Sequence, residues 1–403
     1  MVSLAKKARA LTSADPAAAV ALLREHAAPM DEHAERHAMA LGQALVADCQ
    51  VDQAVEHLRE SIAKSDAPSV HMRKMLSTAL LLNGEIDAAT SMLSSAVADG
   101  LEIESLSFAQ QHLLRDKMLR DEPGNPMLDV LTGMIMAENC VYDTDNRLAL
   151  IYLGKNACSV LKATVVMNSP LCERYETRYR SQDESIHGFC TNEMDANVAT
   201  ELWFAPDAFR ITVLRDPARR LLSAYLDKFL AKGKKRTGTI RDRNNTVRRA
   251  QAMHGIAADP DRSISFEEFC RFLAVAHDLE MNPHWMPQTR VTGEDIHAYS
   301  FIGHMEKLNE TFELLKNKFN YVPQEKAEEH LAGIPTNVRR LSPTPTGLPA
   351  YRMLPAELLR HRHNSPERSF PSASDFLTPE MARIIEDRFS ADVRFRREAM
   401  AAA

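Results

Sequence analysis

Residues 210–225 read RITVLRDPARRLLSAY, and they indicate the architecture of the larger part of the chain. The first five residues include a continuous apolar and β-branched run, which is typical of a strand buried on both faces of a parallel sheet. Asp216 then provides a good helix N-cap, and Pro217 is favoured at the first helical position. The stretch therefore predicts a strand over 210–214 that passes directly into a helix.

Two further segments repeat this order of strand, turn and helix. Residues 148–153 read LALIYL before Gly154, and residues 299–302 read YSFI before Gly303. Helical patterns follow over 159–168 and 305–319. Strands that alternate with helices form a parallel sheet with helices on its faces. We therefore expect an α/β domain over residues 147–403, with ligands bound beyond the carboxyl ends of the strands.

The first hundred residues are rich in alanine and leucine and contain a repeat of 35 residues. At this offset Ala19, Ala54 and Ala89 coincide, as do Leu23, Leu58 and Leu93. The segment resembles tetratricopeptide repeats, whose period is about 34 residues; a generic helical bundle is the alternative. We expect an all-α repeat domain over 1–100 that binds a protein partner, and a helical connection over 101–146.

The composition excludes several classes of protein. The chain has 403 residues, 45% of them apolar, with a formal net charge of −6. A chain of this length can form a core without disulfides, and a nucleic-acid-binding protein usually carries a basic balance, so no nucleic-acid partner is expected. No run of about 18 apolar residues is present, so we expect no transmembrane helix. The six cysteines form no C-x-x-C pair, which favours free thiols and a cytoplasmic location.

A phosphate-binding turn is predicted after the first of these strands, where residues 153–159 read LGKNACS. Small residues between a strand and a helix turn several backbone N–H groups toward one point, next to the positive end of the helix. Lys155 adds a charge and Ser159 a hydroxyl. A triphosphate loop would have the pattern G-x-x-x-x-G-K-[ST], but Ala149 and Asn156 break that pattern here. The turn therefore suits a phosphate or sulfate group.

A second anion site is predicted at the end of the 210–214 strand. Arg215 ends the strand, and Arg219 and Arg220 precede Ser223 by four and three residues on the helix. A planar guanidinium and a hydroxyl that converge on one crevice suit another phosphate. The alternative is an ordinary helix start with a solvated arginine pair.

Together the two loops resemble those of the sulfotransferases that use 3′-phosphoadenosine 5′-phosphosulfate (PAPS), especially the carbohydrate group. Arg215, Asp216, Pro217, Arg220, Ser223 and Tyr225 match the 3′-phosphate motif R-D-P-x-x-R-x-x-S-x-Y of that group. Lys155, Ala157, Cys158, Ser159 and Lys162 match its 5′-phosphosulfate loop, K-x-[GA]-[CS]-[ST]-x-x-K, although Gly154 and Leu161 replace the usual Pro and Trp. Segments 265–269 (SFEEF), 282–288 (NPHWMPQ) and 301–306 (FIGHME) extend the resemblance over about residues 147–398.

The resemblance implies that the chain transfers a sulfuryl group from PAPS to a carbohydrate hydroxyl by in-line displacement, without a metal. It implies contacts to PAPS from Lys155, Asn156, Ala157, Cys158, Ser159, Arg215 and Ser223. Lys155 would also be catalytic, because charge develops on the leaving phosphate. The hydroxyl needs a base, and histidine suits neutral pH. His187 is preferred, because related carbohydrate enzymes often place their base there; His284 is the alternative.

Two other functions stay open at this point. The chain could be a P-loop-like kinase, although the missing triphosphate loop argues against this. It could also be an inactive transferase fold that serves as a repeat-based binding protein, although Lys155, Arg215 and Ser223 are retained. Residues 228–249 hold nine Lys or Arg and one acid, and we interpret them as a loop, either solvated or acting as a lid that attracts anions.

Overall fold

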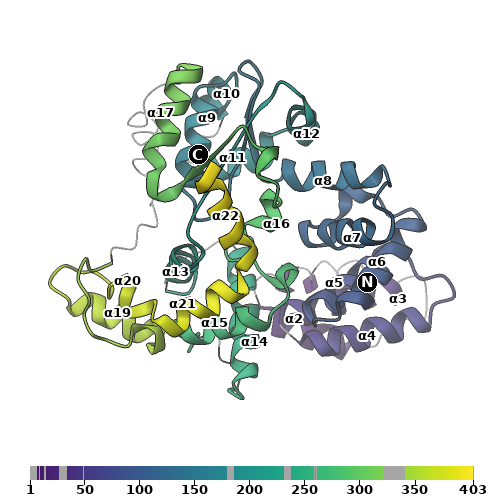
Figure 1. The fold of residues 1–403 in the computed structure, drawn as a ribbon. Helices are drawn as coiled ribbons and strands as arrows, with labels where there is room; N and C mark the ends of the chain where they lie inside the picture. Colours follow the sequence, from purple (N-terminus) through teal and green to yellow (C-terminus); the bar gives the residue numbers. More distant parts are fainter. Residues whose placement is uncertain are drawn as a thin grey trace. The chain divides into compact units, whose positions relative to one another are not determined.

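The structure is a computed structural model that describes residues 7–8, 10–12, 15–26, 34–48, 50–178, 186–230, 237–257, 259, 261–321 and 341–402. Two compact units make up the chain (Figure 1). The first consists of 1–131 with 234–249, and the second of 132–233 with 250–403. The boundaries at residues 100 and 146, taken from the sequence pattern, stay a prediction.

The first unit is built from helices that each pack on the next along the chain. They are α2 (Pro16–Glu25), α3 (Ala34–Ala47), α4 (Val51–Ala63), α5 (Val70–Leu82), α6 (Ile86–Ala98) and α7 (Phe108–Asp121). Helices α2, α4 and α6 begin 35 residues apart, and the alanines and leucines that coincide in the repeat are all buried. The segment is thus helical, as expected, while its assignment to the tetratricopeptide repeats stays a prediction.

Two helices contain residues of both units. Helix α8 (Met127–Ala137) falls in the predicted helical connection, and α14 (Thr237–Met253) falls in the basic segment. The expectation of a loop over 228–249 is therefore wrong from Thr237 onward, where the chain forms a helix. Residues 231–236 lie outside the described part. None of the helices in the described ranges combines the length and the apolar character needed to cross a membrane.

The second unit contains a four-stranded sheet in the order β1-β2-β3-β4. Its strands are β1 (Cys140–Asp143), β2 (Leu148–Ile151), β3 (Phe209–Leu214) and β4 (Phe301–His304). Strands β2, β3 and β4 are parallel, as predicted, with Leu148 opposite Phe209 and Ile211 opposite Phe301. Strand β1 pairs antiparallel with β2 and was not predicted, because four residues between a helix and a turn carry little periodicity.

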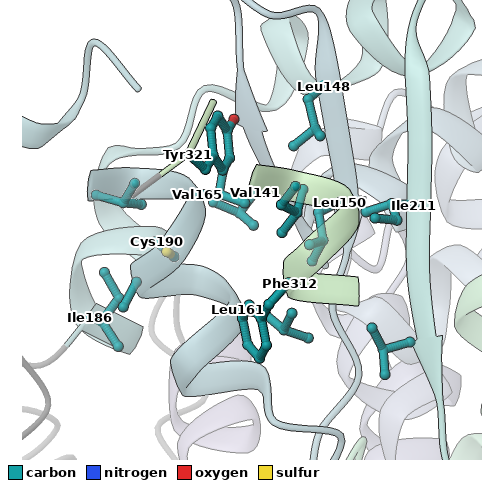
Figure 2. Close-up of a cluster of buried hydrophobic side chains, with 14 of the residues drawn as sticks. Val141, Leu148, Leu150, Leu161, Val165, Ile186, Cys190, Ile211, Phe312 and Tyr321 are labelled. Carbon is teal, nitrogen blue, oxygen red and sulfur yellow. The ribbon is translucent and has the colours of Figure 1, made fainter. Parts of the chain in front are cut away.

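Helices cover the sheet on both faces. The parallel pairing of β2 with β3 places the carboxyl ends of these two strands side by side. Residues from β1, β2 and β3 form one core with α9 (Cys158–Met167), α11 (Ile186–Glu193) and α17 (Leu308–Phe319), as Figure 2 shows for Leu150, Ile211, Leu161 and Phe312. Helix α12 (Ala196–Phe204) contacts β1 and β2 outside this core. The remaining elements are α10 (Cys172–Arg178), α13 (Pro217–Lys228), α15 (Phe266–Val275), α16 (Thr289–Thr292), α19 (Pro355–Asn364), α20 (Ala373–Phe376), α21 (Pro379–Arg388) and α22 (Ser390–Ala402).

An aromatic cluster fixes the segment between α15 and α16. The ring of Trp285 lies 5.7 Å from that of Phe229, the C-cap of α13, and 5.8 Å from that of Phe269 on α15. Aromatic contacts of this kind contribute about 0.5–1.5 kcal/mol each beyond the buried area. Residues 282–288 are thus anchored next to α13, the helix that follows β3.

Candidate functional site

The turn after β2 has the strained backbone that a compact anion site requires. Lys155 and Ala157 both adopt left-handed conformations, with φ of 73° and 56°. Ala157 is also the N-cap of α9, which begins at Cys158. Such conformations cost an L-residue about 1–2 kcal/mol and are concentrated at functional sites. The turn and the positive end of α9 thus lie together, as the sequence predicts.

Two arginines connect this turn to the end of β3. Arg215 donates from Nη1 to the carbonyl of Lys155 at 2.7 Å. Arg220 is almost fully buried and donates from Nε to the carbonyl of Gly154 at 3.0 Å. Burial lowers the pKa of Arg220 to about 10. This value is still well above neutral pH, and the guanidinium therefore stays protonated. The two loops predicted separately from the sequence therefore form one site, and Arg220 has a structural role in it.

Residues 282–288 form the third wall of the site. Arg220 also donates to the carbonyls of Met286 at 2.6 Å and Pro283 at 2.9 Å. The Oε1 atom of Gln288 accepts from Nδ2 of Asn156 at 2.7 Å and from the backbone N–H of Arg215 at 3.1 Å. Gln288 was not among the predicted site residues and entered only as part of the segment 282–288 that carries the resemblance. Its buried amide nevertheless bridges the turn after β2 and the end of β3 directly.

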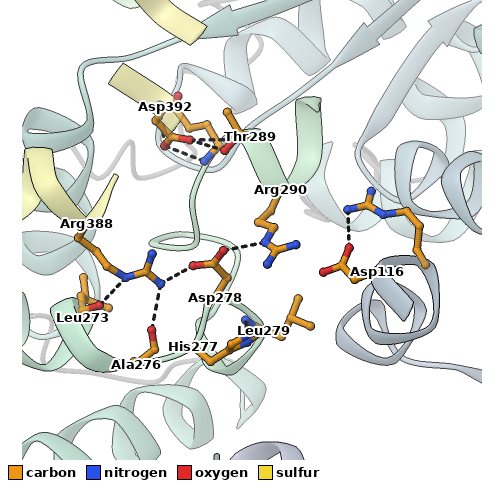
Figure 3. A network of polar contacts seen from close by, with 12 residues as sticks. Asp116, Leu273, Ala276, His277, Asp278, Leu279, Thr289, Arg290, Arg388 and Asp392 are labelled. Atoms are coloured by element: carbon orange, nitrogen blue, oxygen red, sulfur yellow. Dashed lines mark hydrogen bonds and ion pairs between the residues drawn. The ribbon is translucent and has the colours of Figure 1, made fainter. Parts of the chain in front are cut away.

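Buried hydrogen bonds and partly buried ion pairs hold this third wall against the C-terminal helices. Asp392 on α22 accepts from the backbone N–H groups of Gln288 and Thr289, at 2.8 and 2.9 Å. Figure 3 shows this contact, together with Asp278, which pairs with both Arg290 and Arg388. The contacts of Asp392 with Gln288 and of Asp278 with Arg388 follow from no local motif, because they join residues more than a hundred positions apart, whereas Asp278 and Arg290 are 12 positions apart.

The lysine of the turn has a buried carboxylate partner. The Nζ of Lys155 lies 2.5 Å from Oδ2 of Asp227 on α13, and Lys228 lies 3.1 Å from the same oxygen. Burial lowers the pKa of Lys155, while the attraction of Asp227 opposes that shift. Burial acts to raise the pKa of Asp227, but Lys155 and Lys228 outweigh it and keep the pKa below its ordinary value. Lys155 is thus held in place before any ligand binds, by a residue that the sequence had not indicated.

His187, the predicted base, lies beside the turn. Its Nε2 is 2.8 Å from Oγ of Ser159, and its Nδ1 is 3.3 Å from Nζ of Lys162. Lys162 is buried, and its ammonium lies 3.4 Å from the centre of the Tyr152 ring. Burial lowers the pKa of Lys162. The structure therefore brings His187 together with the turn through two neighbouring side chains of α9.

His284 lies against the turn from the opposite loop. A Cβ atom at Gly154 would be 3.4 Å from both Cα and Cδ2 of His284. The Nδ1 of His284 lies 2.6 Å from Oδ1 of Asn282. Burial, together with the positive charges of Lys228 and Lys155, holds the pKa of His284 well below its ordinary value. Its ring is therefore neutral at neutral pH.

Most of the predicted site residues come together, while Ser223 is joined to none of them by a hydrogen bond in the described ranges. Lys155, Asn156, Ala157, Cys158, Ser159, His187 and Arg215 all lie in the turn, at the start of α9 or next to them. Ser223 is half-buried on α13, and its hydroxyl has no hydrogen bond to any residue in the described ranges. Over those same ranges, no group of three or more His, Cys, Asp or Glu is placed to hold a metal ion.

Comparison with curated proteins finds relatives that share part of this chain. Carbohydrate sulfotransferase 14 of Mus musculus is 28% identical over 202 residues, which are 48% of this chain and 52% of the relative. The Homo sapiens protein of the same name is 29% identical over 202 residues, with the same coverage. The Danio rerio protein is 26% identical over 184 residues, 45% of this chain and 48% of the relative.

These comparisons fix the family without covering the whole of each protein. The chain spans about half the length of the curated relatives it matches. No solved structure matches it. The profile of the sulfotransferase family matches residues 138–395, which contain the sheet, both predicted phosphate loops and the segment that joins them. The match covers more than half of the chain, and the chain therefore belongs to the sulfotransferase family.

Proposed function

We propose that this chain transfers a sulfuryl group from PAPS to a hydroxyl group of a carbohydrate. The observation that carries the proposal is the contact between Arg215 and the carbonyl of Lys155, which unites two predicted anion sites in one place. A donor with phosphates on both its 3′ and 5′ oxygens needs two such sites close together. The names of the curated relatives support a carbohydrate as acceptor.

In the proposed reaction, the acceptor oxygen attacks sulfur in line with the bond to the 5′-phosphate. That bond breaks, and its electron pair stays on the phosphate oxygen. The N–H groups at the start of α9 and the ammonium of Lys155 stabilise this charge. Because Asp227 already holds Lys155, little reorganisation is needed when the donor binds. A histidine beside the turn takes the proton, and both His187 and His284 are placed there.

Arg215→Ala is expected to weaken the binding of 3′-phosphoadenosine 5′-phosphate (PAP), the product, by about tenfold to a hundredfold. The reason is the loss of charge-assisted hydrogen bonds worth about 1.5–3 kcal/mol. Isothermal titration calorimetry of the full chain with PAP measures the effect. Arg219→Ala is the matched control, because Arg219 is exposed on the same helix. Equal PAP affinity in Arg215→Ala and wild type contradicts the assignment of the 3′-phosphate site.

Sulfuryl transfer is expected to continue in excess chelator. The charge on the leaving 5′-phosphate is stabilised by Lys155 and backbone N–H groups, so that no divalent ion is needed for it to leave. Transfer of label from PAPS before and after addition of EDTA measures this directly. A loss of turnover that magnesium restores would instead favour the P-loop-like kinase, as would binding of ATP in preference to PAP.

A further inference from the structure

The hydrogen bonds of Asn282 determine which ring nitrogen of His284 carries a hydrogen. The backbone N–H of His284 donates to Oδ1 of Asn282 at 3.0 Å, so this atom is the amide oxygen. The same oxygen lies 2.6 Å from Nδ1 of His284. An oxygen can only accept, so Nδ1 carries the hydrogen. A neutral imidazole has a single N–H, and Nε2 of His284 therefore keeps its lone pair.

The Cδ2 edge of the ring, next to Nε2, lies against the turn after β2. Cδ2, the carbon bonded to Nε2, lies 3.4 Å from the place that a Cβ of Gly154 would take. His284 as a residue is partly exposed, and in the described part of the chain its Nε2 has no hydrogen-bond partner. The charged groups around it are Lys228, Lys155, Asp227 and Arg220. Nε2 is thus a neutral acceptor beside the turn that is proposed to hold the phosphosulfate.

The hydrogen bonds of His187 give it the opposite arrangement. An ammonium can only donate, so Lys162 donates to Nδ1 of His187 at 3.3 Å. The single hydrogen of the neutral ring then lies on Nε2, which donates to Oγ of Ser159 at 2.8 Å. As long as Lys162 is protonated, His187 has no free lone pair directed at the turn. Its geometry suits the positioning of Ser159.

We propose that His284, through Nε2, takes the proton of the acceptor hydroxyl in the sulfuryl transfer, and that His187 is a positioning residue for Ser159. The proposal rests on the function proposed above. As the acceptor oxygen forms its bond to sulfur, its O–H bond breaks and the proton moves to Nε2 of His284. The bond from sulfur to the 5′-phosphate oxygen breaks with its electron pair on that oxygen. The resulting imidazolium keeps its Nδ1–H bond to Asn282.

His284→Ala is expected to lower kcat by about 100- to 10,000-fold, the usual contribution of a positioned general base. PAP affinity should change by less than about threefold, since no phosphate contact is lost. Added imidazole should restore part of the turnover, because it can occupy the space left by the ring. His187→Ala should lower kcat by less than His284→Ala, through the lost positioning of Ser159, and added imidazole should restore none of that loss. The exposed His297 provides the matched control His297→Ala.

Asn282→Asp provides a second test in a variant that keeps the ring. A carboxylate against Nδ1 raises the pKa of His284, because it favours the imidazolium. The base is lost below this pKa, so the acidic limb of the kcat/KM profile for the donor should move to higher pH. A purely structural role for His284 would leave that limb where it is in wild type. An unmoved limb in Asn282→Asp therefore overturns the proposal.

The remaining outcomes separate this proposal from the proposed function. If His187→Ala loses turnover that imidazole restores while His284→Ala keeps it, His187 is the base and the proposal is overturned. If His284→Ala keeps wild-type kcat, the proposal is also overturned, but sulfuryl transfer stands. If wild type binds no PAP and moves no label from PAPS, the proposed function itself fails, and the base assignment with it.

Discussion

Lys155→Met is expected to lower kcat about 100- to 1000-fold, which is the usual effect of removing one preorganised stabiliser of transition-state charge. The ammonium of Lys155 is fixed beside the turn by Asp227 before any ligand binds. The variant should still fold, because Asp227 keeps Lys228 as a partner at 3.1 Å. Steady-state turnover of PAPS in wild type and variant provides the measurement.

Lys228→Met is the matched control for this prediction. It removes a positive charge that pairs with the same carboxylate of Asp227. Lys228 directly follows Asp227 in the chain and lies outside the turn. We expect kcat to fall by less than about tenfold, because Lys155 and its contact to the turn remain. A value of kcat in Lys155→Met within threefold of wild type would contradict the role assigned to Lys155.

Arg220→Met is expected to lower the free energy of unfolding by about 3 to 5 kcal/mol. The substitution removes the donor from the buried carbonyl of Met286 and from the partly buried carbonyls of Gly154 and Pro283, at about 1–3 kcal/mol for a buried unsatisfied group. The methionine side chain fills most of the volume, so that little of the effect comes from a cavity. As the variant unfolds, the turn after β2 and residues 282–288 should lose their contact first.

Tryptophan fluorescence during urea unfolding measures the free energy of unfolding of the second unit, which contains Arg220. The chain has two tryptophans, Trp203 and Trp285, and both are buried in the second unit. Arg219→Met, on the exposed side of the same helix, is the control and should change the free energy by less than about 0.5 kcal/mol. An equally small change in Arg220→Met would show that its three hydrogen bonds are dispensable.

The parts of the fold that were predicted correctly depend on contacts between near neighbours in sequence. The stretch around β3 is the clearest case, because Asp216 caps α13 by accepting from the N–H of Arg219 at 2.9 Å and Pro217 begins the helix. The parallel order of β2, β3 and β4 followed from apolar runs of the right length. The turn between β2 and α9 was likewise expected from its small residues, while its binding of a phosphate stays a prediction.

The parts that were missed depend on pairs of residues far apart in sequence. Asn156 and Gln288 are separated by 132 positions, and Lys155 and Asp227 by 72. Neither pair leaves a periodic or local signal, since each residue alone reads as an ordinary polar side chain. The orientation of the histidine rings is of the same kind, because it depends on Asn282 and Lys162. Residue types alone could therefore suggest two bases, and only the hydrogen bonds distinguish them.

Transfer of ³⁵S from labelled PAPS to a panel of unsulfated and desulfated glycans tests the central claim most directly. The full chain should label at least one glycan, with the label released by acid as sulfate, and Lys155→Met should label the same glycan at least about 100-fold more slowly. Label that stays in PAPS across the whole panel, while the chain transfers the γ-phosphate of ATP to the same glycans, would contradict the account.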